Sequence, residues 1–234
     1  MSNPSPIEDT SLSAISFIAQ GITKRYGFKP LFSNISFSLQ RGERLALAGR
    51  NGSGKTTLLK ILSGLMRPSE GTTQLTFDGI ILERESYFKH SGFAGPYLTF
   101  YDELTGLENI QFALGQSIKK THQEQFEIIE HLFQTLNLWH ARDAMLKTYS
   151  SGMIQRLRLI QAFARPAKLL FLDEPTATLD TDGKARFEKL LEDTAPHVIS
   201  LIASNDPDEI SLCQKKLQIT DFYRKPLEDT TPQK

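Results

Sequence analysis

Cysteine is nearly absent from this 234-residue sequence, which contains Cys213 alone. A single cysteine cannot form an internal disulfide, and no cysteine or histidine cluster has zinc-site spacing, so the sequence indicates a reducing compartment such as the cytosol. Long apolar runs are also missing. None approaches the roughly 18 residues of a membrane-spanning helix, and the N-terminus lacks the basic and apolar segments of a signal peptide. If the protein acts at a membrane, we expect another chain to supply the membrane-spanning part.

An excess of charge of either sign is missing as well, because 27 lysines and arginines balance 27 aspartates and glutamates. Nucleic-acid-binding surfaces usually need a basic stripe, so we expect no nucleic-acid partner. With 39% hydrophobic and 23% charged residues, the chain has the composition of an ordinary globular protein that is long enough to bury a core.

Hydrophobic periodicity predicts an α/β core with a helical insertion. We expect strands over residues 14–22, 35–39, 44–48, 169–172 and 197–203, helices over 55–65 and 121–138, and a mostly helical subdomain over about 95–165. Residues 1–12 are rich in serine and proline and predict a disordered tail, and residues 13–234 are expected to form one domain.

Short local patterns support several of these predicted elements. Asp78-Gly79 is typical of a hairpin turn, and two pairs, Thr105 with Glu108 and Thr121 with Glu124, have the spacing of a helix capping box. In the 121–138 helix, one apolar face is expected to contain Phe126, Ile129, Leu132, Phe133 and Leu136.

A phosphate-binding loop follows the strand at 44–48. Its eight residues match the pattern G-x-x-x-x-G-K-[ST] and are Gly49, Arg50, Asn51, Gly52, Ser53, Gly54, Lys55 and Thr56. Glycines allow the backbone to turn its N–H groups toward phosphate oxygens, and the helix that begins near Lys55 directs its positive end at the same anion. Lys55 is expected to reach the β- and γ-phosphates, Thr56 to ligate Mg²⁺, and Thr57 to add a phosphate contact.

Two acids, Asp173 and Glu174, end the apolar strand at 169–172. The carboxyl ends of central strands in α/β sheets face the crevice where ligands bind. We expect Asp173 to hold Mg²⁺ through its waters and Glu174 to orient or deprotonate an attacking water. Without a phosphate loop in the same chain, two solvated acids at a strand end would be the simpler interpretation.

In this order and spacing, the motifs resemble the ATP-binding subunits of ABC transporters over about residues 14–212. The resemblance implies a P-loop NTPase of ABC type, in which a mixed-sheet core carries an antiparallel β subdomain and an inserted helical subdomain. It also implies ATP and Mg²⁺ as cofactors. Tyr26 stands where the family has an aromatic residue that stacks on adenine; a core tyrosine is the alternative interpretation.

The family signature is similar to residues 149–156, YSSGMIQR, which keep Ser150 and Gly152 but depart from the usual L-S-G-G-Q at Tyr149, Ser151 and Met153. The resemblance implies that Ser150, Ser151 and Gly152 contact the ATP held by a second subunit, so a head-to-tail homodimer is expected. A plain N-capped helix is the alternative. Residues 177–180 (ATLD) resemble the loop by which the two family subunits contact each other.

Two departures concern hydrolysis and coupling. Asn205 stands where the family has a switch histidine, and an amide donates a hydrogen bond but does not become cationic. Tyr97 stands where the family has a glutamine that contacts Mg²⁺, and a phenol is a poor ligand for that ion. We therefore list Asn205 with Glu174 and Lys55 as catalytic candidates, and expect slow hydrolysis.

The resemblance implies an ATPase that energises a transmembrane permease in a separate chain, from the cytoplasmic face of the membrane. The signature variant, the absence of a long C-terminal extension and the Gly-Pro segment before ELTGLEN are similar to exporter-type subunits, including that of the haem exporter of cytochrome c maturation. Two alternatives stay open: a soluble ABC ATPase for assembly, of the iron–sulfur type, and an ATP-dependent dimerisation module with very slow hydrolysis. The aromatics Tyr97, Phe100 and Tyr101 are expected beside the groove for the permease, or else packed inside the helical subdomain.

Overall fold

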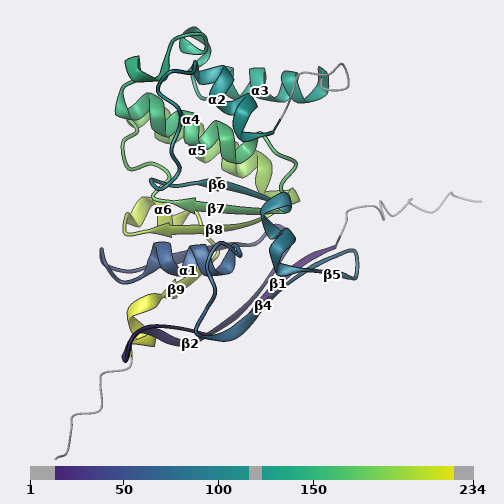
Figure 1. The fold of residues 1–234 in the computed structure, drawn as a ribbon, viewed down its shortest axis with the longest axis vertical. Coiled ribbons are helices and arrows are strands. Elements are labelled where there is room, and N and C mark those ends of the chain that lie inside the picture. Colours follow the sequence, from purple (N-terminus) through teal and green to yellow (C-terminus); the bar gives the residue numbers. More distant parts are fainter. Residues whose placement is uncertain (1–13, 116–122, 224–234) are drawn as a thin grey trace, which may run out of the picture.

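The computed structural model describes residues 14–115 and 123–223, which form two sheets and a group of helices (Figure 1). An antiparallel sheet has the order β2-β1-β4-β5, and a parallel sheet has the order β6-β7-β8-β3-β9. The strands are β1 (Ile15–Tyr26), β2 (Lys29–Gln40), β3 (Arg44–Ala48), β4 (Glu70–Phe77), β5 (Ile80–Leu82), β6 (Ser91–Ala94), β7 (Leu169–Asp173), β8 (Ile199–Ser204) and β9 (Lys215–Gln218).

Six α-helices accompany these strands in the part of the chain that the structure describes. They are α1 (Lys55–Leu62), α2 (Gly106–Ala113), α3 (Gln123–Thr135), α4 (Ser151–Phe163), α5 (Thr181–Thr194) and α6 (Pro207–Ser211). Five short 3₁₀ turns connect them: η1 (Arg84–His90), η2 (Trp139–Ala141), η3 (Leu146–Thr148), η4 (Ala195–His197) and η5 (Ile219–Phe222). None of the helices described is long and apolar enough to span a bilayer.

The antiparallel sheet lies on one side of α1 and the parallel sheet on the other (Figure 1). Leu58 and Leu59 of α1 join Phe17 and Phe32 of the antiparallel sheet and Phe171 of β7 in one buried cluster. The expected hairpin turn is confirmed, since Asp78 and Gly79 adopt φ angles of 48° and 79° between the paired strands β4 and β5.

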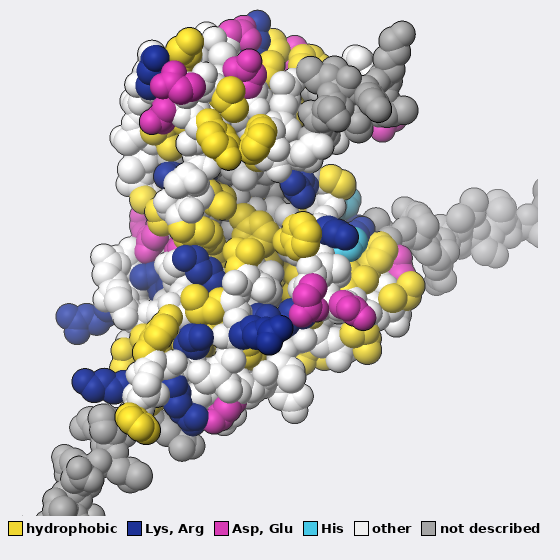
Figure 2. All heavy atoms as spheres, viewed as in Figure 1, with side chains coloured by type: hydrophobic (Ala, Val, Ile, Leu, Met, Phe, Trp, Pro, Cys, Tyr) yellow, Lys and Arg dark blue, Asp and Glu magenta, His cyan; other side chains and the backbone are white. Residues whose placement is uncertain are grey.

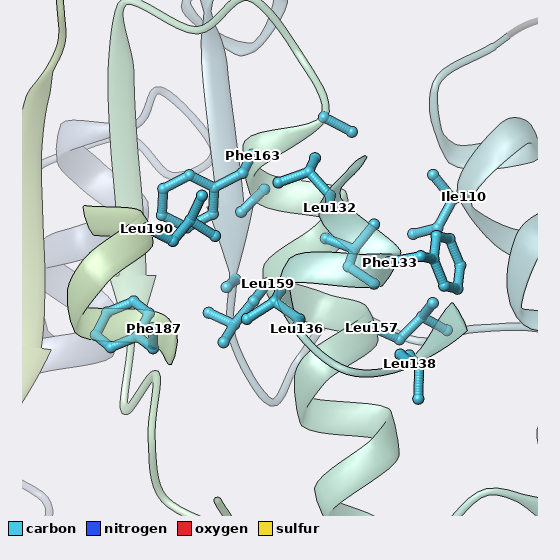
Figure 3. Packing of buried hydrophobic residues seen from close by; sticks show 14 of the residues in the cluster. Ile110, Leu132, Phe133, Leu136, Leu138, Leu157, Leu159, Phe163, Phe187 and Leu190 are labelled. Atoms are coloured by element: carbon cyan, nitrogen blue, oxygen red, sulfur yellow. The ribbon is translucent and has the colours of Figure 1, made fainter. Parts of the chain in front are cut away.

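The strands of the parallel sheet are buried on both faces, which explains their continuous apolar sequence. In β7, Leu169 and Phe171 face the α1 cluster, whereas Leu170 and Leu172 face a second cluster on the opposite side. That second cluster joins α2, α3, α4 and α5, whose side chains meet in Figure 3. The predicted α/β core with a helical insertion is therefore confirmed.

Some predicted details were wrong. α1 ends at Leu62 rather than residue 65, because Gly64 adopts a left-handed φ of 84° and Leu65 is 55% exposed. α3 ends at Thr135 rather than 138, and Phe126 is 39% exposed because the buried part of α3 begins only at Ile129. The Thr105–Glu108 capping box is confirmed, whereas Thr121 and the tail at 1–12 lie outside the described residues.

Candidate functional site

The phosphate-type loop at 49–54 connects the buried strand β3 to α1. Gly52 and Gly54 adopt φ angles of 81° and 96°, a region that side chains with a Cβ rarely enter. A Cβ on Gly54 would also lie 2.8 Å from Leu31 Cδ2. The glycines therefore let the loop curl tightly around the N-terminus of α1, where backbone N–H groups favour an anion.

Lys55 and Glu174 face each other at the floor of this loop. The buried Lys55 Nζ donates to the Gly49 carbonyl at 2.9 Å and lies 3.4 Å from Glu174 Oε1. Glu174 has a φ of 48°, which is uncommon for a residue with a side chain, and its N–H donates to the Ala203 carbonyl at 2.8 Å. This left-handed turn directly after β7 directs the carboxylate toward the lysine instead of along the strand.

Thr56 and Asp173 form a second polar pair beside the first. Thr56 Oγ1 donates to Asp173 Oδ2 at 2.6 Å. Burial raises the pKa of Asp173 above its ordinary value, while the hydrogen bond from Thr56 and the charges of Lys55 and Lys60 oppose that rise. A hydroxyl beside a carboxylate is an oxygen donor set of the kind that Mg²⁺ prefers.

Within residues 14–115 and 123–223, no group of three or more histidine, cysteine or acidic side chains is placed to hold a metal ion by itself. This arrangement fits an ion held by one carboxylate and one hydroxyl, with phosphates and water supplying the other positions, rather than an ion in an all-protein cage. Thr56 and Asp173 are the residues that would hold it.

These groups open into one cleft of about 460 Å³. The cleft is lined by Tyr26, Leu31, Asn51, Gly52, Gly54, Lys55, Thr56, Thr57, Pro96, Asp173 and Glu174. Tyr26 is 58% exposed at the edge of the cleft, so the alternative of a core tyrosine is wrong. Arg50 and Gly49 line a neighbouring hollow, and Ser53 is buried with no hydrogen-bond partner for its hydroxyl among the described residues.

Ser150, Ser151 and Gly152 lie elsewhere, at the start of α4. Ser150 caps the helix, its Oγ accepting from the Met153 N–H at 3.3 Å. A hollow of about 370 Å³ lies over this helix start, with Gly152 and the 178–180 segment in its wall. Within one chain, the structure therefore does not bring the signature-like residues to the phosphate-type loop.

Two residues that the sequence reading missed, Asn137 and His140, complete this second hollow. Both residues follow α3. No sequence motif links them to Ser150, so the sequence did not indicate that they lie beside the start of α4. Arg156 links two segments beside this hollow, because it donates to Asp180 Oδ1 at 2.7 Å and to the Leu136 carbonyl at 2.9 Å.

Asn205 follows β8 on the rim of the first site. Its Nδ2 donates to Asn51 Oδ1 at 3.2 Å, so the amide contacts the phosphate-type loop. The preceding Ser204, which the sequence reading missed, places its Oγ 3.4 Å from Glu174 Oε2. Glu209, also missed, is buried nearby, and its Oε1 accepts from the Thr176 N–H at 2.7 Å.

The three aromatics expected on an exposed groove do not share one environment. Tyr97 is half-buried with its hydroxyl enclosed, and Phe100 is half-buried and packs against the helical core. Tyr101 alone of the three is exposed, at 55%, and its ring packs edge-on against Phe112 with centroids 5.0 Å apart. Phe100 therefore follows the alternative of packing inside the helical subdomain, whereas a permease groove beside these residues stays a prediction.

Charged side chains of both signs occur over the surface. Figure 2 shows several lysine and arginine side chains on the lower half of this face, over the region of α1 and the antiparallel sheet, with some acidic side chains among them, and side chains of both signs at the top, over the helices.

Comparisons with known proteins identify the family and the fold. The family model described as "ABC transporter" matches residues 32–177. An uncharacterised ABC transporter ATP-binding protein of Bacillus subtilis, YdbJ, is 35% identical over 75% of this chain and 56% of its own length. The sulfate/thiosulfate import ATP-binding protein CysA of Rhodopseudomonas palustris is 30% identical over 88% of this chain and 60% of its own length.

A third relative, the linearmycin resistance ATP-binding protein LnrL of Bacillus subtilis, is 31% identical over 71% of this chain and 53% of its own length. The chain thus spans between half and two thirds of each of these curated relatives. Among solved structures, an ATP-binding subunit of an ABC transporter aligns with a TM-score of 0.75 at 22% identity, covering 86% of this chain and 85% of its own.

A dimeric bacterial ABC transporter cassette aligns with a TM-score of 0.73 at 21% identity, covering 86% of this chain and 93% of its own. At these identities the structural likeness shows the fold.

Proposed function

Because this chain belongs to the ABC transporter family of ATP-binding proteins, we propose that it binds ATP with Mg²⁺ and hydrolyses it to energise a transport cycle. One observation carries the proposal: Lys55, Thr56, Asp173 and Glu174 line a single cleft at the N-terminus of α1. Asp173 lies 117 residues after Thr56 in the sequence, so the convergence of these side chains is a product of the fold.

The nucleotide would lie with its phosphates in the 49–57 loop. The backbone N–H groups and Lys55 neutralise the phosphates, Thr57 adds a hydroxyl, and Tyr26 at the edge of the cleft offers its ring to the adenine. Thr56 and Asp173 would hold Mg²⁺, which when bound would neutralise charge at the phosphate that is transferred. Glu174, whose backbone turn points its carboxylate into the cleft, orients the attacking water and accepts its proton.

The two separate hollows support a homodimer. Ser150, Ser151 and Gly152 would contact the ATP held by a second copy, because the start of α4 is a helix N-terminus that favours an anion and lies apart from its own chain's phosphate loop. Two copies arranged head to tail would then enclose two nucleotides. One of the structural neighbours is described as a dimeric cassette.

The transport role needs a permease in a separate chain and places this protein on the cytoplasmic face of the membrane. Of its named relatives, one serves sulfate/thiosulfate import and another linearmycin resistance. We favour export, and a subunit similar to that of the haem exporter, on the signature variant at 149–153 and the Gly-Pro segment at 95–96.

A second candidate is a dimerisation module that hydrolyses ATP very slowly. The observation that favours it is the amide of Asn205, which donates to Asn51 and carries no charge toward a phosphate. A soluble assembly ATPase is the remaining alternative, and it would lack a membrane partner.

Two substitutions test the proposal. Lys55→Ala should abolish or greatly weaken ATP binding, whereas Glu174→Gln should retain binding, lower hydrolysis at least about 100-fold and trap a dimer. Size-exclusion chromatography with ATP and Mg²⁺ detects the dimer, and Glu192→Gln, an exposed glutamate on α5, is the matched control. Glu174→Gln protein that hydrolyses ATP like wild type would refute the assignment of the base.

The trapped Glu174→Gln dimer also separates the transport and assembly alternatives. Affinity purification of this variant from detergent-solubilised membranes should recover a polytopic membrane protein if the chain serves a permease. Recovery of soluble proteins alone would favour the assembly ATPase.

A further inference from the structure

Glu209 of α6 is a buried acid to which the proposed function assigns no role. Its side chain accepts two hydrogen bonds from one residue, because Oε1 accepts from the Thr176 N–H at 2.7 Å and from Thr176 Oγ1 at 2.5 Å. The other oxygen, Oε2, is buried without a hydrogen-bond partner among the residues that the structure describes, and the whole residue is 3% exposed. Burying a carboxylate costs free energy, so stability alone does not account for an acid at this position.

Thr176 lies in the turn that carries Glu174. Glu174 adopts a left-handed φ of 48°, a backbone conformation that persists only where the surrounding structure holds it. From the α4 side, Gln155 Nε2 donates to the Pro175 carbonyl at 2.7 Å. From the α6 side, Glu209 holds Thr176. The turn after β7 is therefore fixed by one side chain from each side.

Ser204 makes a second connection between Glu209 and Glu174. β7 and β8 are parallel neighbours with Asp173 paired to Ala203 (Figure 1). Glu174 and Ser204 therefore follow at the same end of the sheet, and Ser204 Oγ lies 3.4 Å from Glu174 Oε2. Burial raises the pKa of Glu209 and the charge of Glu174 adds to the rise, whereas the Ser204 hydroxyl opposes it. The hydroxyl of Ser204 thus faces both carboxylates.

We propose that Glu209 is a positioning residue for ATP hydrolysis, which fixes the turn after β7 so that the Glu174 carboxylate points at the attacking water. Glu209 does not line the nucleotide cleft, so it acts through Glu174 and not on the nucleotide. α6 begins two residues after Asn205, and the same acid therefore connects this turn to the segment that contacts the phosphate-type loop. The inference rests on the proposed role of Glu174 as the base.

Steady-state ATPase kinetics of Glu209→Ala test this role. Loss of both hydrogen bonds to Thr176 should lower kcat about 10- to 100-fold, the effect of a small misplacement of a catalytic group. The KM for ATP and the affinity for a fluorescent mant-ATP analogue should stay within about threefold of wild type, because the phosphate-type loop is unchanged. Glu209→Gln keeps an oxygen that accepts from Thr176, and should recover kcat to within about threefold of wild type.

Lys184→Gln is the matched control. Lys184 Nζ and Asp206 Oδ2 form an ion pair of 3.2 Å between α5 and the residue that caps α6, so this variant breaks a different contact of the same region. The pair is partly exposed and contributes little, so kcat should stay within about twofold of wild type. Wild-type kcat for Glu209→Ala, an equal loss in the control, or Glu209→Gln as slow as Glu209→Ala would overturn the assignment.

A double variant separates positioning from a general loss of structure. If Glu209 acts through Glu174, adding Glu209→Ala to Glu174→Gln should leave the residual single-turnover rate within about threefold of that of Glu174→Gln alone. A further loss of about tenfold or more would show that Glu209 acts independently of the base, and would overturn the proposal. If Glu174→Gln hydrolyses ATP like wild type, the proposed base fails instead.

Thr176→Val covers the case in which Glu209→Ala does not fold. It removes the hydroxyl that donates to Glu209 and keeps the backbone N–H that donates to the same oxygen. Loss of this one hydrogen bond to a carboxylate should lower kcat at least about threefold, with the KM for ATP unchanged. Folded Thr176→Val protein with wild-type kcat would contradict the positioning role.

Discussion

Glu174 illustrates how single residues in this protein depart from local preference. Its φ of 48° is disfavoured for a residue with a side chain. The hydrogen bond from its N–H to Ala203 and the salt bridge of its carboxylate with Lys55 hold it there. Backbone strain at the end of a central strand is thus balanced by contacts that aim a carboxylate into the cleft.

Asn205 is a second single residue for which we predict a measurable contribution, in this case to the rate of ATP hydrolysis. Asn205→Ala should lower steady-state ATPase activity by about tenfold if its amide, placed beside Asn51, bonds a phosphate in the transition state. An amide does not titrate, so the wild-type rate should not fall through loss of charge at this position between about pH 6 and 8. ATPase assays at equal dimer content over this pH range check both points.

Asn205→His provides the comparison for this prediction. It should raise the rate if the rim has room for the ring, and should introduce a dependence on imidazole protonation near neutral pH. Equal rates for wild type and Asn205→Ala would make Asn205 a bystander, and Ser204, which lies 3.4 Å from Glu174, would be the next residue to test.

At the scale of elements, strand and helix ends form the site. β3, β7 and β8 are neighbours in the parallel sheet with their carboxyl ends together, so the 49–54 loop, Asp173 with Glu174, and Asn205 reach one edge. α1 then adds its N-terminus. The helical region has its own stabilising ends, of which the Thr105 cap of α2 is the best defined.

Removing that cap gives a stability prediction. Thr105 Oγ1 accepts from the Glu108 N–H, and Glu108 Oε2 accepts from the Thr105 N–H. Thr105→Ala should therefore lower the free energy of unfolding by about 1 kcal/mol. Denaturant unfolding measures it, with Thr99→Ala, an exposed threonine in the preceding loop, as the control. Equal losses for the two variants would show that the cap contributes nothing specific.

At the scale of the whole molecule, the two hollows and the exposed aromatic pair define three separate contact regions. The phosphate-loop cleft and the signature-like hollow are suited to two copies of the chain. Tyr101 and Phe112 instead form an exposed edge-to-face pair on the helical region. Exposed aromatic pairs of this kind are typical anchors of protein interfaces.

We predict that Tyr101 lies at the surface that receives the permease. A photo-cross-linking residue at position 101 should capture a membrane protein when the partner is expressed. The same residue at Ile80, which is 65% exposed on β5, should not. Capture of soluble proteins alone from position 101 would count decisively against this surface.

Four features could be predicted from the amino-acid sequence alone: the phosphate-type loop, the acidic strand end, the α/β class and the Thr105 cap. Each of these depends on residues that are close in the chain or on a periodicity of neighbouring side chains. Asp78-Gly79 and the buried strands were predictable for the same reason.

Contacts between residues far apart in the chain could not be predicted in this way, because they depend on how the elements pack. Four such features depend on strand pairing and helix packing between distant segments. They are the position of the Tyr97 ring over Gly95, its contact with Lys60, the burial of Glu209 and the place of His140 in the second hollow. An aromatic side chain is compatible with a core or a surface, and its sequence neighbours do not say which. The pairing of β6 with β7, and the packing of α1 against β7, determine where the Tyr97 ring has room.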